Sequence, residues 1–303
     1  MPVVALATLA SFAVSASLVC VRRATVTANP LFGVALVVAV GCLIFPIATI
    51  ATGDARQIGD MAWQSHALFA IVGVIHFVVG RSLNYIAIQA LGASRTTVVV
   101  TTYPLFALPI AIPLFDEPFS LLAAFGVVLV IAGPVLMTQG EARTAVRPIA
   151  GASAPTPSQT ARGFASAAGA AALLGLSFVL VKIALNESDE PVLGTTISYW
   201  GALVALGAYV VATRTSKLFV GLNRPAIAWY FAAALFVALS QGARYLALSE
   251  GDVTIVVVLM QTVPIIVFGL TFIMNRSIES LNGFIVIGSV LVVAGTSLVV
   301  SQI

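Results

Sequence analysis

Long apolar runs alternate with short polar connectors along the whole chain. Each run is roughly 20 residues long, which is the length that an α-helix needs to cross the hydrocarbon core of a membrane. The connectors contain residues that end helices and make turns, such as Asn29-Pro30 and Thr52-Gly53-Asp54. The pattern predicts ten membrane-spanning helices, at residues 2–20, 31–51, 67–89, 95–114, 119–138, 163–183, 193–213, 225–248, 253–274 and 280–300.

The composition supports this interpretation and excludes a soluble domain. Hydrophobic residues make up 60% of the 303 positions and charged residues 8%, with a mean hydropathy of +1.10. Continuous runs such as residues 284–300 do not alternate as the strands of a membrane β-barrel do. The first run resembles a secretory signal in length, but no basic segment precedes it, so we expect it to be helix one. We predict an all-α integral protein of the cell membrane, surrounded by lipid.

Cysteine and charge content narrow the chemistry further. Cys20 and Cys42 lie in apolar runs that have no histidine or acidic residue at metal-ligand spacing. We therefore expect no disulfide framework, no metal and no cofactor. The formal net charge is +3, but the basic residues are scattered singly along the chain, so we expect no nucleic-acid partner.

The longest connector, residues 139–162, divides the chain into two halves, residues 1–138 and 163–303. It is rich in alanine, proline, serine and threonine, which is typical of a flexible linker. Residues of the first half recur in the second at a nearly constant offset. The pairs are Ser17/Ser177, Arg22/Lys182, Tyr85/Tyr245 and Pro104/Pro264 at 160, Pro30/Pro191 and Gly33/Gly194 at 161, and Glu117/Glu279, Gly126/Gly288 and Gly133/Gly295 at 162.

These pairs predict an internal repeat of five helices. Because five is odd, the second copy must enter the membrane from the opposite side. Inverted repeats of this kind are typical of secondary transporters, whose solute site lies near the middle of the membrane between the two copies. The fold prediction is therefore two inverted five-helix repeats around a central cavity.

Two sequence patterns resemble the drug/metabolite transporter superfamily, in particular its ten-helix members with two EamA domains. Residues 174–182 (Leu-Gly-Leu-Ser-Phe-Val-Leu-Val-Lys) are similar to the first-helix pattern Trp-Gly-Ser-x-Phe-x-x-x-Lys, and residues 14–22 are more faintly so. Residues 117–133 and 279–295 look like the loop acid and spaced glycines of the family, which allow close helix packing. Neither half has the Trp of the first-helix pattern, and the Arg that the family often has in its second helix is absent as well. The resemblance covers nearly the whole chain and implies a transporter with one EamA-like repeat in each half.

Two groups of polar residues lie inside the predicted third and eighth helices. Each group has the spacing i, i+3, i+4, so its members share a helical face, and the 160-residue offset superposes one group on the other. We predict that both groups bind the solute: Arg81, Asn84 and Tyr85 in the first half, and Gln241, Arg244 and Tyr245 in the second. The alternative is that the two arginines extend to the lipid headgroups.

The acidic residues point to the class of solute. All eleven fall in connectors or at helix ends. Small multidrug exporters of the same superfamily exchange protons for cationic drugs through a buried glutamate in their first helix, and this chain has none there. Arginines without buried acids favour an anionic or zwitterionic metabolite. We predict a secondary transporter that moves such a metabolite by alternating access; a proton-coupled multidrug exporter is the alternative.

Prolines interrupt the predicted fourth and ninth helices. A proline has no N–H to donate, so we expect a kink at each and free carbonyl groups at Val100 and Met260. Threonines beside the prolines supply polar groups. The candidates for a cavity wall or a hinge are Thr102, Pro104, Thr262 and Pro264, the alternative being a structural kink alone.

Four charged residues mark predicted helix ends. Glu117 and Glu279 precede helices five and ten, where a carboxylate either caps free N–H groups or takes part in ion coupling. Arg22 and Lys182 end helices one and six, where they either neutralise the solute or mark the membrane interface. We keep both alternatives open for each pair.

Rival classes of function fit the sequence less well. A membrane-embedded enzyme would need a nucleophile or metal near a base, but His66 and His76 are the only histidines, and no Gly-x-Ser-x-Gly is present. A receptor or scaffold would not require an inverted duplication. We therefore predict a non-enzymatic protein whose partner is a small-molecule solute, with a homodimer left open.

Two arguments give opposite predictions for the side of the membrane on which the termini lie. Ten basic residues follow the odd-numbered helices, whereas only Arg56 and Lys182 lie on the other side, so the positive-inside rule places both termini outside. The family resemblance implies that both termini are in the cytoplasm. A reporter fused to either terminus distinguishes the two.

Overall fold

The computed structural model describes residues 2–117, 119–143, 156–213, 220–274 and 283–300, and these are almost entirely helical. The helices of the first half are α1 (Pro2–Ala24), α2 (Pro30–Thr52), α3 (Trp63–Val72), a π-helical segment (Gly73–Gly80), α4 (Arg81–Leu91), α5 (Ala93–Val100), α6 (Pro104–Phe115) and α7 (Leu121–Arg143). Those of the second half are α8 (Pro157–Ser188), α9 (Pro191–Thr213), α10 (Arg224–Glu250), α11 (Val253–Leu259), α12 (Val263–Met274) and α13 (Gly283–Val300).

The membrane spans follow the apolar runs. Eight helical segments of the described residues are long and apolar enough to cross a membrane, three of them assembled from consecutive helices: Trp63–Leu91, Ala93–Phe115 and Val253–Met274. Helices α7 and α13 contain the shorter apolar stretches Leu121–Gly133 and Val290–Val299. The predicted all-α membrane fold is confirmed.

Capping residues set several helix boundaries. The Asn29 side chain accepts a hydrogen bond from Leu31 N, and Pro30 occupies the first helical position of α2. Asn223 caps α10 in the same way, accepting from Ala226 N. These polar side chains satisfy N–H groups that no preceding turn can pair, so each span begins at its connector residue rather than within the apolar run.

Helices α7 and α8 extend beyond the apolar runs. Helix α7 continues to Arg143 and α8 begins at Pro157, so both enter the segment 139–162 that the sequence predicted to be a flexible linker. The start of α8 is fixed by a capping box, in which Thr156 and Gln159 each bond the backbone of the other. Residues 144–155 lie outside the described part of the chain.

Both proline-containing spans are interrupted rather than merely kinked. A turn separates α5 from α6 before Pro104, and a 3-10 turn, Met260–Thr262, separates α11 from α12. The prediction that Val100 and Met260 have free carbonyl groups was wrong. These carbonyls accept bonds from the N–H groups three residues later, those of Tyr103 and Val263, because the chain tightens at the break.

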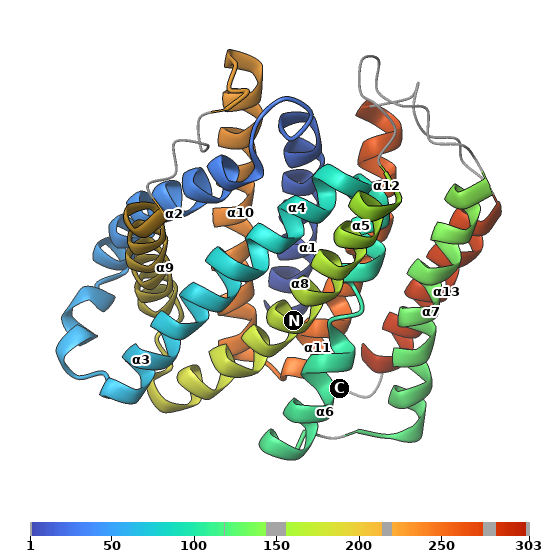
Figure 1. The fold of residues 1–303 in the computed structure, drawn as a ribbon. Coiled ribbons are helices and arrows are strands. Elements are labelled where there is room, and N and C mark those ends of the chain that lie inside the picture. Colours follow the sequence, from blue (N-terminus) through green and yellow to red (C-terminus); the bar gives the residue numbers. More distant parts are fainter. Residues whose placement is uncertain (1, 118, 144–155, 214–219, 275–282, 301–303) are drawn as a thin grey trace.

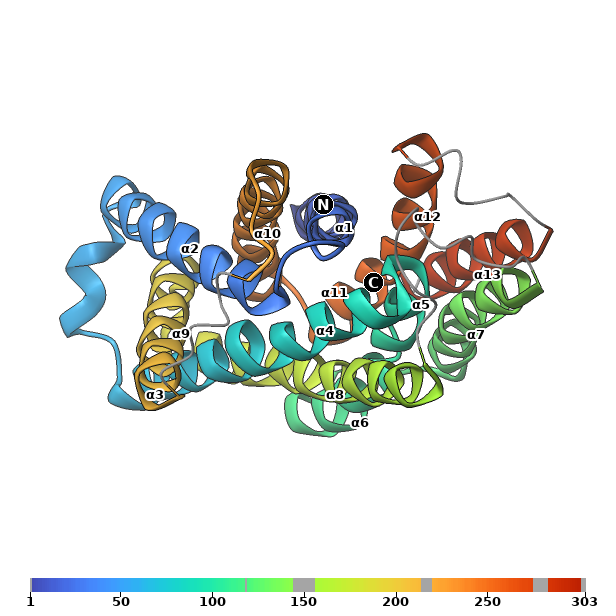
Figure 2. The same ribbon diagram turned by 45° about the horizontal axis from the view of Figure 1, so that its top comes forward.

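Equivalent helices of the two repeats pack against each other in opposite directions. Figures 1 and 2 show α7 beside α13 at one end of the bundle, with α2 and α9 at the other. A Cβ atom on Gly126 would lie 2.8 Å from Gly295 O, and one on Gly133 would lie 2.6 Å from Gly288 O. The first glycine of one helix thus meets the last of the other, as in an antiparallel pair, which is the packing expected of inverted repeats.

One hydrogen bond within the first half has an equivalent within the second half. Arg22 Nη1 donates to Ile88 O at 3.2 Å, and Lys182 Nζ donates to Leu248 O at 2.9 Å. Each bond joins residues 66 positions apart, and the two bonds are related by the internal repeat. The cations therefore satisfy carbonyl groups in the last turns of α4 and α10, where a positive charge also complements the helix dipole.

Glu117 caps a helix of the other repeat. Its two carboxylate oxygens accept hydrogen bonds from Val253 N at 2.7 Å and Thr254 N at 2.9 Å, at the start of α11, and the Thr254 hydroxyl donates to it as well. The sequence predicted a cap on the helix that follows Glu117, so the type of interaction is as expected and its partner is different. The equivalent residue, Glu279, lies outside the described residues.

We expect Glu117→Ala to lower the free energy of unfolding by about 2 kcal/mol, because it leaves two buried N–H groups without an acceptor. Glu117 is buried, whereas its neighbour Asp116 is exposed, so Asp116→Asn serves as the control. Thermal unfolding in detergent, followed with a thiol-reactive dye that reports exposure of buried Cys20, measures both. An equal effect of the two substitutions would contradict the bridging role.

Candidate functional site

A cavity of about 80 Å³ lies where the two repeats meet. It is lined by the first, third and fourth spans of each repeat. Twelve of its lining residues form six pairs related by the 160-residue offset: Val14/Leu174, Leu18/Phe178, Arg81/Gln241, Asn84/Arg244, Val100/Met260 and Tyr103/Val263. A cavity lined by equivalent positions surrounds the pseudo-two-fold axis, as expected for the solute site of an inverted-repeat carrier.

One hydrogen bond joins equivalent positions of the two repeats and therefore lies near the pseudo-two-fold axis. Gln261 Nε2 donates to Thr101 O at 2.8 Å, and these residues are 160 positions apart, so they are equivalent in the two repeats. Both lie in the breaks between helices, Thr101 after α5 and Gln261 after α11. The two interrupted spans therefore meet at the cavity, and the amide of one repeat satisfies a backbone carbonyl of the other.

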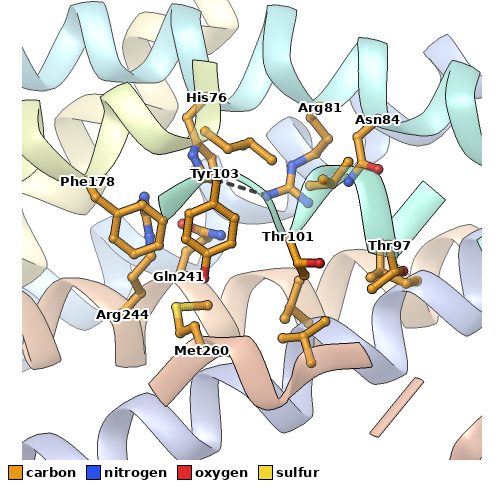
Figure 3. A pocket seen from close by; sticks show the side chains of 15 residues that line it. His76, Arg81, Asn84, Thr97, Thr101, Tyr103, Phe178, Gln241, Arg244 and Met260 are labelled. Carbon is orange, nitrogen blue, oxygen red and sulfur yellow. Dashed lines mark hydrogen bonds between the residues drawn. The ribbon is translucent and has the colours of Figure 1, made fainter. Parts of the chain in front are cut away.

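Arg81 and Arg244 line this cavity from α4 and α10. Their side chains are 4% and 1% exposed, so neither extends to the lipid headgroups, and the snorkelling alternative is wrong. In Figure 3 the two guanidinium groups lie apart along the cavity, with His76 and Gln241 between them and Asn84 beside Arg81.

A chain of side chains connects the two arginines. Arg81 Nη2 lies 3.3 Å from His76 Nε2, and His76 Nδ1 lies 2.8 Å from Ser177 Oγ. Arg244 Nη1 donates to the same Ser177 oxygen at 3.3 Å. These hydrogen bonds run from Arg81 and His76 of the first repeat to Ser177 on α8 and Arg244 on α10 of the second repeat, so the cationic groups of both halves are held in one network.

Aromatic rings lie against both guanidinium groups. The Arg244 Cζ lies 4.8 Å from the ring centroid of Phe178 and 5.1 Å from that of Tyr245, and the Arg81 Cζ lies 6.0 Å from that of Tyr85. The negative ring faces stabilise the cations. Tyr85 and Tyr245 are fully buried and pack against the arginines without lining the cavity themselves.

Several guanidinium N–H groups are left without a partner among the described residues. These are Arg81 Nε, Arg244 Nε and Arg244 Nη2, all buried and all on side chains that line the cavity. A buried donor on a charged group is costly to leave unpaired. The arginines that line the cavity therefore combine positive charge with unpaired hydrogen-bond donors, which suits a solute that carries acceptor oxygens.

Comparison with known proteins agrees with this geometry. The sequence model of the EamA-like transporter family matches residues 1–139 and 161–301. The chain belongs to the EamA-like transporter family. A solved crystal structure of a protein superimposes with a TM-score of 0.72, covering 98% of this chain and 96% of its own at 16% sequence identity, which shows the shared fold. Among curated proteins, none matches the chain.

Within the described part of this EamA-like transporter, the acidic residues lie in connectors or at the ends of the spans. In one such group, burial raises the pKa of Glu190, the neighbouring charges of Asp54 and Asp189 raise it further, and a hydrogen bond from Gln57 opposes them. All four residues belong to connectors or helix ends. No carboxylate lies within the interior of a described span, so the two arginines have no acidic partner there.

The candidate hinge residues do not line the cavity. Pro104 and Pro264 are buried behind it, and the hydroxyls of Thr102 and Thr262 donate to carbonyl groups of their own spans, those of Val99 and Leu259. A hinge at the two breaks stays a prediction.

Sequence reasoning missed several residues of the site. Thr97 lies one turn before Thr101 and lines the cavity, as does Phe178. Their spacing could have indicated Thr97 and Thr101 as one face. His76 could not have been placed this way, because in an α-helix a residue five positions before Arg81 would lie about 140° around the axis.

Proposed function

We propose that this protein is a secondary transporter of the cell membrane that carries a small anionic or zwitterionic metabolite by alternating access. The observation that carries this proposal is the pair of buried arginines in a cavity shared by two inverted repeats, with open guanidinium donors and no buried carboxylate partner among the described residues. An isolated buried charge is unfavourable, so two buried cations favour a ligand of opposite charge.

The interrupted spans support alternating access. The breaks before Pro104 and in Met260–Thr262 both lie at the cavity wall and are linked by the Gln261–Thr101 hydrogen bond. A break divides a span into two halves that can tilt separately, and the inverted repeat provides the same device facing the opposite side. Rocking of one repeat against the other would open the cavity to each side in turn.

Counterflow into proteoliposomes tests the proposal. Vesicles containing the purified protein are loaded with one unlabelled solute, and uptake of the labelled form is compared with protein-free vesicles. The solutes tested are of two classes. The anions and zwitterions are sulfate, phosphate, short carboxylates and zwitterionic amino acids, and the lipophilic cation is tetraphenylphosphonium. We expect exchange of at least one anion or zwitterion. Exchange of the lipophilic cation alone would contradict the proposal and favour a multidrug exporter.

A further inference from the structure

The histidine between the two arginines has a single consistent proton arrangement. His76 is 4% exposed and lies in the π-helical segment Gly73–Gly80. This segment brings it to Arg81, because the Arg81 N–H bonds His76 O, five residues earlier. The wider π turn places the two side chains on nearly the same face, and π-helical turns occur frequently at functional sites.

The hydrogen-bond partners determine where the imidazole proton is. An arginine can only donate, so His76 Nε2, 3.3 Å from Arg81 Nη2, must accept. A neutral imidazole with an accepting Nε2 has its proton on Nδ1, which donates to Ser177 Oγ at 2.8 Å. The Ser177 proton then goes to Leu174 O at 2.6 Å, and its oxygen also accepts from Arg244. Each of these four hydrogen bonds pairs one donor with one acceptor only when His76 is neutral.

A second proton on His76 would change this arrangement. Its Nε2–H would face an N–H of Arg81, and a third positive charge would lie between two others. The charged groups that act on His76 among the described residues are Arg244 on α10 and Arg81 on α4. The other packed helices present no acid to it; α9 contributes the phenol of Tyr199, stacked on Phe77.

An anion in the cavity would reverse the balance. It would accept the bonds that Arg81 now makes to His76 and would offset the third charge. The protonated imidazole would then become a further donor to the anion. Since each of the two ligands favours binding of the other, the coupling is reciprocal.

We propose that His76 is the proton-binding residue of the transport cycle, so that one proton enters and leaves with each anionic solute. The proton comes from water on the side where the solute binds, is held at Nε2 while Arg81 engages the solute, and returns to water on the other side. This inference rests on the proposed anion site and names its coupling ion.

Sulfate binding at different pH values tests the coupling. Sulfate does not titrate between pH 6 and 8, so any change in its affinity comes from the protein. We expect the Kd for sulfate of the wild-type protein to rise by about tenfold per pH unit, since only the protonated form binds strongly. His76→Gln retains an amide acceptor for Arg81 but cannot take up the proton, and we expect it to bind sulfate with less than a twofold change over this range.

The other histidine provides the matched control. His66 is half-buried on α3, and its Nδ1 contacts the carbonyl of Ala62 in its own turn. His66→Gln should retain the full pH dependence. A second readout does not depend on folding of a variant: a pH-sensitive dye inside wild-type proteoliposomes should report acidification as sulfate enters.

The outcomes separate this inference from the proposed function. Sulfate binding that is independent of pH in the wild type, or a pH dependence that survives in His76→Gln, would overturn the proton role and leave the anion site intact. Absence of sulfate binding at every pH would overturn both.

Discussion

We expect Arg244→Met to reduce anion binding and transport by about a hundredfold. The substitution removes a charge and the unpaired Nε and Nη2 donors from the cavity while preserving much of the side-chain volume. Charge-assisted hydrogen bonds to a ligand are worth about 3 kcal/mol in total, which corresponds to about two orders of magnitude in Kd. Arg244→Lys retains the charge but not the planar set of donors, so we expect an intermediate loss of about tenfold. Counterflow and equilibrium binding measure both quantities.

Stability separates this effect from unfolding. Because Arg244 is a buried cation without an acidic partner, Arg244→Met should leave the free energy of unfolding unchanged or raise it by about 1–3 kcal/mol when no anion is present. Arg224→Gln, at the exposed start of the same helix α10, is the control and should transport normally. Unimpaired transport by Arg244→Met, or loss of transport accompanied by unfolding, would contradict the binding role.

Gly73→Ala should prevent stable folding or lower the free energy of unfolding by about 3 kcal/mol. A Cβ atom at Gly73 would collide with the backbone carbonyl oxygen of Ser198 and lie 3.0 Å from Ala202 N. One turn along α9, a Cβ on Gly201 would lie 2.7 Å from Ala70 O, so the two helices interlock through backbone contacts. Overpacking against backbone cannot be relieved by a change of rotamer. Thermal unfolding with the thiol-reactive dye measures the loss.

An exposed glycine on α9 provides a control for which we expect the opposite effect on stability. Gly207 of α9 is exposed, and no atom lies within 4 Å of a Cβ built on it. Gly207→Ala should therefore stabilise the protein by about 0.5–1 kcal/mol, because alanine loses less backbone entropy than glycine in a helix. Equal unfolding temperatures for the Gly73 and Gly207 variants would show that the π-helical segment does not pack closely against α9.

The fold could be predicted from the sequence because the membrane makes its signals strong. Each span requires a long apolar run, and the repeated tyrosines, prolines and glycines disclosed the duplication. Five spans per repeat then required the inversion that the antiparallel packing of Gly126 against Gly295 confirms. None of these steps depended on knowing a side-chain contact.

The site could be predicted only where α-helical geometry applies. Arg81 and Asn84 were expected on one face and both line the cavity, whereas Tyr85 packs behind Arg81. The position of His76 depends on a π-helical segment that no spacing rule indicates. Glu117 was identified as a cap from its position, but its partner helix is set by contacts between repeats.

Alternating access requires that the polar cavity between the inverted repeats open in turn to the two sides of the membrane. Thr97 is 3% exposed, lines this cavity, and is close in shape to cysteine, so Thr97→Cys in a chain with Cys20 and Cys42 replaced by alanine reports its accessibility. An impermeant thiol reagent is applied to right-side-out and to inside-out vesicles. We expect labelling from both sides of the membrane, slowed in each case by the transported anion. Labelling from one side only, or from neither, would contradict it.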